Sequence, residues 1–302
     1  DYIISNPPFG IPWKREEKEV TAEYKKGTAG RFAPGLPAKG DGQLLFMLNG
    51  LAKLKDDGQM AIIQNGSSLF NGDAGSGPSE IRRYLIENDW LDAIVQLPGN
   101  AFYNTPIATY IWIVMKNKPV THQGKVQLID ASACASSRRK NIGEKKVDIT
   151  KACRDLIIEA YGAYVNDTYN GVDENNNTIV VKSKVMDAVD LGYNKIVVET
   201  PQFDEDGNVI MKKKKPVADT SKRDTENVPL AEDIDDYFER EVIPYNQQAW
   251  IDKSKTKVGY EIPFTRTFYE YKQIEPSDVI AARIEEHEKS LMAKLHDLFG
   301  GE

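Results

Sequence analysis

The chain has 302 residues, of which 40% are hydrophobic and 28% charged, with 22 glycines and 15 prolines. These fractions are typical of a globular protein and exclude collagen-like, low-complexity and wholly disordered classes. No apolar run approaches the roughly 20 residues of a membrane-spanning helix, so we expect no integral membrane protein. The formal net charge of −7 excludes a protein that holds nucleic acid by bulk electrostatics alone. A nucleic-acid role would need a local site or a basic partner.

Two cysteines, Cys134 and Cys153, exclude a disulfide scaffold and a multi-cysteine zinc site. They fit a reducing compartment, so the expected location is cytoplasmic. The chain begins with Asp1 instead of Met, and residues 1–5 have the pattern of a buried strand, unlike a signal or transit peptide. We therefore expect a fragment of a longer protein whose first strand lies at a sheet edge, where it invites strand-mediated contacts or poor solubility.

The first 118 residues alternate between apolar strands and amphipathic helices. Strands are predicted over residues 1–5, 60–63, 91–97 and 108–115, and helices over 44–54 and 79–88. This order is typical of a parallel sheet covered on both faces. Only about ten residues separate the last two strands, too few for a crossover helix, so these strands should be antiparallel. The predicted fold class is α/β: the second half of a doubly wound sheet with an antiparallel hairpin at one edge.

A polar stretch interrupts this pattern between the motif at residues 6–9 and residue 42. It is rich in Gly, Pro and basic residues, shows no clear period and, at about 30 residues, is long for a connector; such loops are usually functional or mobile. Beyond residue 118 we expect a strand over 126–129, helices over 152–164, 234–242 and 276–299, and exposed loops or hairpins over 166–177 and 199–227. The domain prediction is a half-sheet over 1–118, a mixed extension over 119–274 and a C-terminal helix over 275–302, stopped by Gly300-Gly301.

The most specific motif is Asn6-Pro7-Pro8-Phe9, which directly follows the first strand. Ligands bind at the carboxyl ends of strands in α/β sheets. One interpretation is structural: two prolines make a rigid turn as the chain leaves the strand. The other is catalytic, because the Asn6 side-chain oxygen and the Pro7 carbonyl are two acceptors that could hold an exocyclic amine. Phe9 would then stack on a base, which must be flipped out of a duplex to reach it.

Residues 6–10 resemble the catalytic motif of amino-group methyltransferases. The wider pattern resembles the modification subunit of type I restriction–modification systems, an N6-adenine DNA methyltransferase family. Further stretches that carry this resemblance are residues 30–37, 41–46, 80–91, 97–112, 237–242 and 259–266. The resemblance implies a Rossmann-like, S-adenosyl-L-methionine-dependent sheet that methylates a flipped adenine in double-stranded DNA. It also implies a specificity (S) subunit and a restriction (R) subunit as partners, and no membrane.

The resemblance assigns roles to individual residues. Asn6 and Pro7 would hold the adenine amino group, and Phe9 would stack on the base. Pro8, which lies between Pro7 and Phe9, would stiffen the backbone. Asn6 would also border the cofactor. Phe102 matches a second aromatic residue near the target base, although packing in the core is an equal interpretation.

Lys14 and Arg15 would contact DNA from the long polar stretch, although a solvated loop explains them equally well. The glycine-rich cofactor loop and the acidic residue on the cofactor's ribose precede the motif in this family, and neither is found here. Gly66, Gly72, Gly75 and Gly77 do not form a strand–Gly-x-Gly–helix unit. We therefore expect that this chain alone binds the cofactor poorly and is inactive.

The C-terminal helix carries an apolar stripe in a coiled-coil-like spacing. Its members are Ile280, Ile284, His287, Leu291, Leu295 and Leu298. The stripe fits either packing on the chain's own core or, as the resemblance implies, docking on the S subunit. Other candidate sites are weak. Residues 204–208 are similar to the start of a calcium loop, but Val209 stands where that loop needs Gly and Lys215 where it needs Glu, and His122, His287 and His296 are scattered. The four lysines at 212–215 are interpreted as a solvated loop, with phosphate contact as the alternative.

Two other functions stay open. A glutamine-N5 methyltransferase acting on release factors uses a similar Asn-Pro-Pro motif, but it needs neither the stretch at 10–42 nor a long tail. A non-catalytic fragment would serve only as an assembly module for the S subunit. Calorimetry with S-adenosyl-L-methionine distinguishes an assembly module from an enzyme.

Overall fold

A computed structural model describes residues 1–271 and 275–299 of the chain. The chain divides into two compact units, Asp1–Thr267 and Phe268–Glu302. The described part of the second unit contains the helix α8 (Ser277–Phe299), close to the predicted bounds. The predicted helix stop at Gly300-Gly301 lies outside the described residues. Among the described helices, none combines the length and the apolar character needed to traverse a bilayer.

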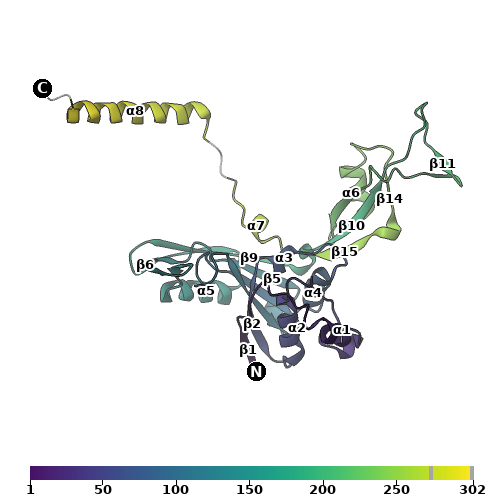
Figure 1. The fold of residues 1–302 in the computed structure, drawn as a ribbon, viewed down its shortest axis with the longest axis horizontal. Helices are drawn as coiled ribbons and strands as arrows, with labels where there is room; N and C mark the ends of the chain where they lie inside the picture. Colours follow the sequence, from purple (N-terminus) through teal and green to yellow (C-terminus); the bar gives the residue numbers. More distant parts are fainter. Residues whose placement is uncertain (272–274, 300–302) are drawn as a thin grey trace. The chain divides into compact units, whose positions relative to one another are not determined.

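The first unit is built on a seven-stranded mixed sheet in the order β1-β2-β4-β3-β5-β9-β8 (Figure 1). The strands are β1 (Tyr2–Ser5), β2 (Gln59–Asn65), β3 (Leu91–Gln96), β4 (Thr109–Met115), β5 (Lys125–Asp130), β8 (Asp167–Val172) and β9 (Thr178–Asp187). β1 is parallel to β2, β4 is antiparallel to both β2 and β3, and β5 is parallel to β3. The strands β1, β2, β3 and β5 therefore all end at the same edge of the sheet.

The position of β4 corrects one prediction. β4 is antiparallel to β3, as expected, but it lies inside the sheet between β2 and β3 and not at an edge. Trp112 pairs with Ile62 on one side and with Ile94 on the other, and its side chain is fully buried. The short connection requires only that β4 pair with β3. The strand's strongly apolar sequence favours the interior position, where both faces are covered.

The sheet also continues past the predicted boundary at residue 118. β5 joins β3, and the polar segment after residue 166 supplies β8, which pairs with β9 at the far edge. Ile179 and Val181 of β9 are buried, whereas Thr178 is exposed and Val180 and Lys182 are only partly buried. This alternation buries one face of the strand pair and exposes the other. The predicted boundary at 118 therefore does not end the sheet.

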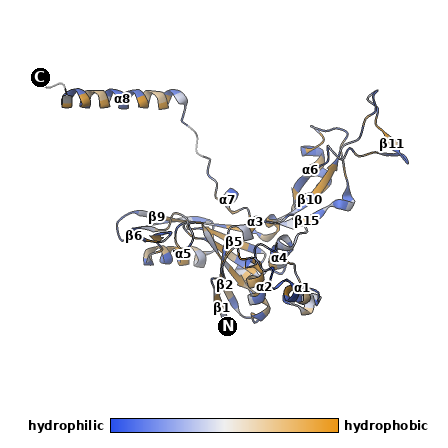
Figure 2. Ribbon diagram, viewed as in Figure 1, coloured by the Kyte–Doolittle hydropathy of each residue, from blue (hydrophilic) through white to orange (hydrophobic). Residues whose placement is uncertain are grey.

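Helices cover the two faces of the sheet unequally. α2 (Gln43–Lys53) lies on the face that contains Met60, because a Cβ on Gly50 of α2 would lie only 2.6 Å from the Met60 sulfur. Ile81 of α4 (Gly77–Glu87) packs against α2 in one hydrophobic cluster. α5 (Lys151–Ala163) packs on the opposite face, against the side of Val95. Figure 2 shows the strands between these helices as predominantly hydrophobic.

β1 pairs with β2 and with no second strand in the described part of the chain. The prediction of an edge strand is therefore confirmed. Tyr2 and Ile4 are 80% and 88% exposed, so the outward face of this edge is apolar as well as unpaired. Such an edge favours contact with another chain.

The segment at 10–42 is folded, and the prediction of a loop without regular structure is wrong. It contains α1 (Glu17–Tyr24) and the short 3-10 helix η1 (Gly27–Ala29). Trp13, Val20 and Phe32 form a hydrophobic cluster with residues of α2 and α4. The segment lacks a visible period because its few large apolar residues are anchors placed far apart, each fitting a surface made by other elements.

A second, smaller antiparallel sheet completes the first unit. Its strands are β10 (Gly192–Glu199), β13 (Asp224–Pro229), β14 (Trp250–Ile251) and β15 (Lys257–Tyr260), covered by α6 (Ile234–Glu241). The remaining elements are the hairpins β6 (Ser136–Ile142)–β7 (Lys145–Asp148) and β11 (Met211–Lys212)–β12 (Lys215–Pro216), the short helices α3 (Ser67–Phe70) and α7 (Phe264–Thr267), and the 3-10 turns η2 (Val120–His122), η3 (Ala188–Leu191) and η4 (Lys253–Lys255). The predicted turn at Asp206-Gly207 is present, with Gly207 at φ 81°.

Candidate active site at the carboxyl edge of the sheet

The Asn-Pro-Pro-Phe motif lies at the carboxyl end of β1, directly after Ser5. Asn6 is exposed, Pro7 is buried, Pro8 is exposed and Phe9 is partly exposed. Gly10 follows at φ 63°, a left-handed conformation that glycine adopts without strain and that turns the chain away from the strand. The motif is therefore held by a buried proline, while its amide and its aromatic ring remain accessible.

The acceptors of the motif that have no partner within residues 1–271 and 275–299 include the side-chain oxygen of Asn6 and the carbonyl of Pro7. Pro7 and Pro8 have no backbone N–H, so neither can donate a hydrogen bond to these acceptors. The proline rings also restrict the backbone. Such a pair of acceptors can receive two N–H bonds from one amino group. The neighbouring Phe9 ring offers a flat apolar surface. The chemistry that fits is the binding of a planar molecule that carries an amino group.

A buried polar network adjoins the motif at the end of β2, the strand paired with β1. The Gln43 side chain is 1% exposed, and its amide nitrogen donates to Asp41 Oδ2 and to Asn65 Oδ1, each at 2.8 Å. Its oxygen accepts from the Asn65 backbone N–H at 3.0 Å. The Ser67 hydroxyl donates to Asp41 Oδ2 at 2.9 Å. The sequence pattern assigned no role to these residues, although Asp41 and Gln43 lie in the stretch 41–46 that carries the resemblance. The signal for Asn65 and Ser67 is their position at the end of a buried strand.

This network and three hydrogen bonds to backbone carbonyls close the base of the 10–42 segment. Gly42 N–H donates to the Ile11 carbonyl at 3.0 Å, and Trp13 N–H donates to the Lys39 carbonyl at 3.1 Å. The Trp13 indole also donates to the Ala38 carbonyl at 3.0 Å. The two ends of the segment are therefore fixed beside the motif.

Lys14 and Arg15 follow Trp13 directly and are exposed. Neither makes an ion pair with another residue in the described part of the chain. Because Trp13 is held at the base of the segment, both cations lie at the same edge of the sheet as Asn6. Their predicted contact with DNA stays a prediction.

Phe102 lies in the connection between β3 and β4, also at the carboxyl edge. Its ring packs against a hydrophobic cluster that includes Leu97 and Ile129. β3 is three strand spacings from β1, which corresponds to about 14 Å. The structure thus shows the packing contact, and stacking of Phe102 on a base stays a prediction.

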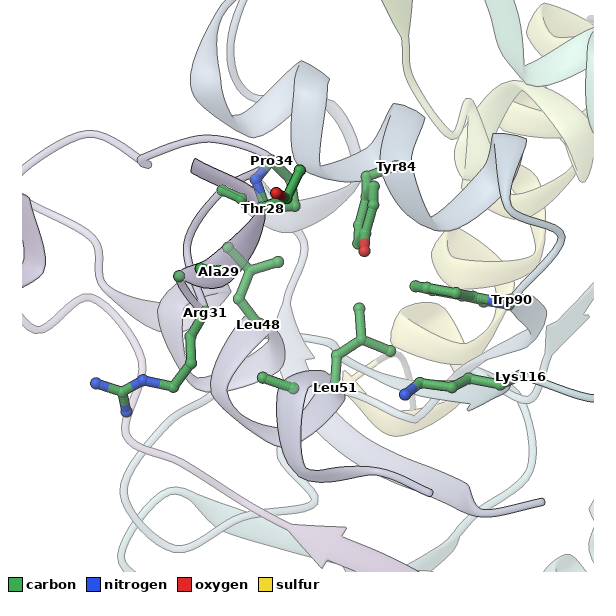
Figure 3. A pocket seen from close by; sticks show the side chains of 12 residues that line it. Thr28, Ala29, Arg31, Pro34, Leu48, Leu51, Tyr84, Trp90 and Lys116 are labelled. Carbon is green, nitrogen blue, oxygen red and sulfur yellow. The ribbon is translucent and has the colours of Figure 1, made fainter. Parts of the chain in front are cut away.

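A pocket of about 530 Å³ lies elsewhere, between α2 and α4 (Figure 3). Tyr84 and Trp90 meet edge to face at 5.2 Å between ring centroids, and Lys116 Nζ lies 5.6 Å from the Trp90 ring. Trp90 precedes β3 and Lys116 follows β4, so this pocket lies toward the amino ends of the parallel strands. A second pocket of about 530 Å³ begins at Ile11 and Pro12, just after the motif. Only the second pocket adjoins the candidate site.

The glycines after β2 do not form a cofactor cradle. A Cβ on Gly77 would lie 1.8 Å from the Leu36 carbonyl oxygen, and a Cβ on Gly35 would lie 2.7 Å from the Gly77 carbonyl oxygen. These glycines permit close packing between the 10–42 segment and α4. Gly72 and Gly75 have positive φ in the turn that precedes α4. These glycines serve packing and turns, so they do not supply the strand–Gly-x-Gly–helix loop expected for a nucleoside cofactor.

The remaining candidates have structural surroundings. His122 Nδ1 lies 2.8 Å from Asp92 Oδ1, and the ring stacks on Tyr164 with 3.5 Å between centroids. Both cysteines are buried and free, and burial raises the pKa of the Cys134 thiol to about 12. A thiol that stays protonated is a poor nucleophile. The Asp204 carboxylate accepts the N–H groups of Asp206 and Asn208, which makes a turn.

The seven-stranded mixed sheet with helices on both faces defines an α/β protein. The chain belongs to the N-6 DNA methylase family, whose family model matches residues 1–202. The predicted resemblance to this family is confirmed.

The chain is similar to methylase subunits of type I restriction enzymes. It is 34% identical over 120 residues to the MpnII subunit of Mycoplasma pneumoniae, covering 39% of this chain and 21% of that protein. It is 29% identical over 145 residues to the MjaIX subunit of Methanocaldococcus jannaschii, covering 47% of this chain and 25% of that protein. A solved methyltransferase subunit of a type I system from Streptococcus thermophilus is 26% identical, with a TM-score of 0.49 over 62% of this chain and 34% of that chain. The matched region thus spans about a quarter of each curated relative.

Proposed function

We propose that this chain is part of the modification subunit of a type I restriction–modification system, which methylates adenine N6 in double-stranded DNA. The family membership supports the reaction class. The single observation that carries the site assignment is the unpartnered acceptor pair of Asn6 and Pro7 at the carboxyl end of β1. In the proposed fold, the sheet is the second half of a doubly wound methyltransferase sheet.

The proposed mechanism gives the motif the task of holding the acceptor amine. The lone pair of an aromatic amino group is delocalised into the ring, which makes the nitrogen a poor nucleophile. If Asn6 Oδ1 and the Pro7 carbonyl each accept one N–H, both hydrogens are held away from the ring plane and the lone pair is directed toward the incoming methyl group. Phe9 would stack on the flipped base, a contact worth about 1–3 kcal/mol. No carboxylate base is needed, because the nitrogen becomes acidic once it is methylated.

S-adenosyl-L-methionine is the proposed methyl donor and supplies an activated methyl group. Because the described glycines do not form its cradle, we derive only the acceptor side of the reaction from this chain. Phe102 is proposed to approach the base, and Lys14 and Arg15 to contact DNA phosphates near it. The S and R subunits are the proposed partners in the complete assembly. DNA as substrate and two free cysteines support a cytoplasmic location.

The test is Asn6→Ala in the assembled modification enzyme. Loss of one acceptor should lower the methylation rate by about 10²–10³-fold, the typical cost of removing one preorganised polar group. Affinity for DNA should change little, because it depends mainly on phosphate contacts. Asn6→Asp keeps an acceptor oxygen at the same position and should retain more activity than Asn6→Ala. If the Asn6→Ala enzyme methylates DNA at the wild-type rate, the proposed catalytic role of Asn6 is wrong.

Two alternatives remain testable in the same assay. A glutamine-N5 methyltransferase would transfer labelled methyl to a release-factor peptide and not to duplex DNA. The folded 10–42 segment, which carries exposed Lys14 and Arg15 beside the motif, favours DNA. An assembly module without catalysis would show no dependence of methylation on Asn6.

A further inference from the structure

The β11–β12 hairpin carries the most concentrated positive charge in the sequence, four consecutive lysines from Lys212 to Lys215. Figure 1 shows this hairpin on an arm that extends beyond β10 and β14. All four lysines are exposed. None of them makes an ion pair with any residue in the described ranges 1–271 and 275–299. The tip is therefore a cationic surface without an internal counter-charge.

The backbone of the tip is unusual for lysine. Lys212 pairs with Lys215, so Lys213 and Lys214 form a two-residue turn, and their φ angles are 52° and 61°. A turn with positive φ at both central residues favours Asn-Gly, because most L side chains avoid this region. Other hairpin turns in the chain follow that rule: they place Gly143, Asn176 and Gly207 at positive φ. Only the lysine tip uses two long side chains there among the described hairpins.

Charge repulsion adds to this conformational cost. Lys212 and Lys215 are directly opposite each other in the ladder, and like charges in that position destabilise a strand pair. The hairpin thus retains four lysines despite an unfavourable turn and an unfavourable cross-strand pair. A binding partner with closely spaced negative charges would remove the repulsion.

The acidic residues on either side of the tip in sequence do not neutralise it. Asp219, four residues after Lys215, forms an ion pair with Lys222 at 3.6 Å. Asp204, Glu205 and Asp206 form the turn at the other end of the strand segment 209–212. Four extended residues separate the two turns by about 13 Å. That distance exceeds the screening length of about 8 Å at physiological ionic strength. From Asn208 to Arg223 the chain has six basic residues and one acidic residue, so the local charge is strongly positive although the whole chain is acidic.

We propose that the tip formed by Lys212–Lys215 binds the phosphate backbone of double-stranded DNA without sequence preference. The inference rests on the proposed function, in which duplex DNA is the substrate. Duplex DNA carries one negative charge per about 1.7 Å of helix axis, dense enough to engage several neighbouring lysines at once. Phosphate contacts of this kind fix the position of a protein on the duplex and carry no base information.

The test is the double substitution Lys213→Asn with Lys214→Gly, which removes two charges and installs the residues that this turn prefers. The hairpin should therefore stay folded, as checked by circular dichroism. Binding of the chain to a labelled duplex of arbitrary sequence is followed by fluorescence anisotropy over a salt series. The slope of log K against log salt should fall in magnitude by about 1.8, or about 0.9 per lost phosphate contact, and affinity should fall about ten-fold or more at low salt.

The matched control is Lys213→Arg with Lys214→Arg, which keeps both charges and should keep the wild-type salt slope. The proposal is overturned if the Asn-Gly variant binds duplex with unchanged affinity and slope, or if the wild-type chain does not bind duplex. It is also overturned if the wild-type chain binds vesicles of phosphatidylserine and phosphatidylcholine more tightly than duplex.

The outcome is separable from that of the proposed function. If the hairpin inference fails, the Asn-Gly variant binds DNA normally while Asn6→Ala still loses methylation. If the reaction assignment fails, Asn6→Ala methylates normally while the Asn-Gly variant still loses DNA affinity.

Discussion

The Arg82 side chain on α4 donates a hydrogen bond of 2.6 Å from Nε to the backbone carbonyl of Tyr260 on β15. The same guanidinium donates from Nη1 to the Ser68 carbonyl at 3.1 Å and to the Asn71 carbonyl at 3.0 Å. Arg82 is fully buried, and burial lowers its pKa to about 10, so it stays charged at neutral pH. One cation therefore joins three parts of the fold: the small sheet at β15, the segment 68–71 that follows β2, and α4, to which Arg82 itself belongs.

Replacing Arg82 should destabilise the first unit strongly. Arg82→Met leaves three carbonyls without this donor, two of them in buried contacts. We expect a loss of about 3 kcal/mol in the free energy of unfolding, measured by urea denaturation. The control is Arg83→Met on the same helix. Arg83 makes half-exposed ion pairs with Glu80 and Glu87, whose loss should cost no more than about 0.5 kcal/mol. Equal effects of the two substitutions would contradict the central role of Arg82.

Removing the Gln43 amide should loosen the base of the 10–42 segment. Gln43→Ala deprives Asp41, Asn65 and Ser67 of their shared partner, which should cost about 1–3 kcal/mol. We expect faster trypsin cleavage within residues 14–39. Gln59→Ala, at the exposed start of β2, removes an amide that is not part of this network and should leave the cleavage rate unchanged. Unaltered proteolysis of Gln43→Ala would show that the segment is held by its hydrophobic anchors alone.

Asp173 should make the stability of the β8–β9 hairpin dependent on pH. Its carboxylate accepts the Ser136 hydroxyl at 2.7 Å and the backbone N–H groups of Asn175 and Asn177 at 2.8 and 2.9 Å. These bonds, that of Ser136 first, hold the pKa of Asp173 well below its usual value. Because the folded-state pKa is depressed, the stabilisation is complete above the unfolded-state pKa of about 3.9 and is lost as the pH falls below it.

The measurement compares urea midpoints of the wild type and Asp173→Asn from pH 7 to pH 3. The wild type should be more stable at pH 7, and the difference should shrink as the carboxylate is protonated. Glu174→Gln, at the exposed neighbouring position, should match the wild type throughout. A difference between wild type and Asp173→Asn that is constant with pH would show that the carboxylate charge is not the source of the stability.

The α8 helix should be needed for assembly and not for folding of the sheet. It belongs to a separate compact unit, and Ile284 and Leu291 of its apolar stripe are 56% and 59% exposed. Removing residues 276–302 should leave the circular dichroism signal of the sheet unit intact and weaken co-purification with the S subunit. Leu291→Glu should do the same, because a buried unpaired carboxylate is costly in any interface.

Lys289→Glu is the control for this helix, because position 289 lies on the side opposite the stripe. It should co-purify with the S subunit normally. If both the truncated chain and Leu291→Glu co-purify with the S subunit at the wild-type yield, the stripe does not dock on that subunit. Unfolding of the truncated chain would assign the stripe to this protein's own core.

The local pattern of the sequence was sufficient to predict most strands and helices and the place of the candidate site. Apolar runs such as Met60-Ala61-Ile62-Ile63 are too short for helices and pair as strands in almost any context. The position of Asn6 follows from the same logic, because a motif directly after a strand must lie at that strand's carboxyl end. These features depend on neighbours in the chain, so periodicity and turn chemistry are enough to predict them.

Only the tertiary structure decided how distant segments meet. β4 lies between β2 and β3 because it pairs with both strands, and the pairing with β2 involves a partner distant in sequence. The contact of Arg82 with Tyr260 joins residues that are 178 positions apart. Trp13 and Phe32 had no visible period because each fits a surface built by α2 and α4. The left-handed Lys213-Lys214 turn contradicts local preference, so no propensity could have predicted it. Local sequence determines the elements because their hydrogen bonds are short-range, whereas burial of specific side chains against one another is settled only when the whole chain has packed.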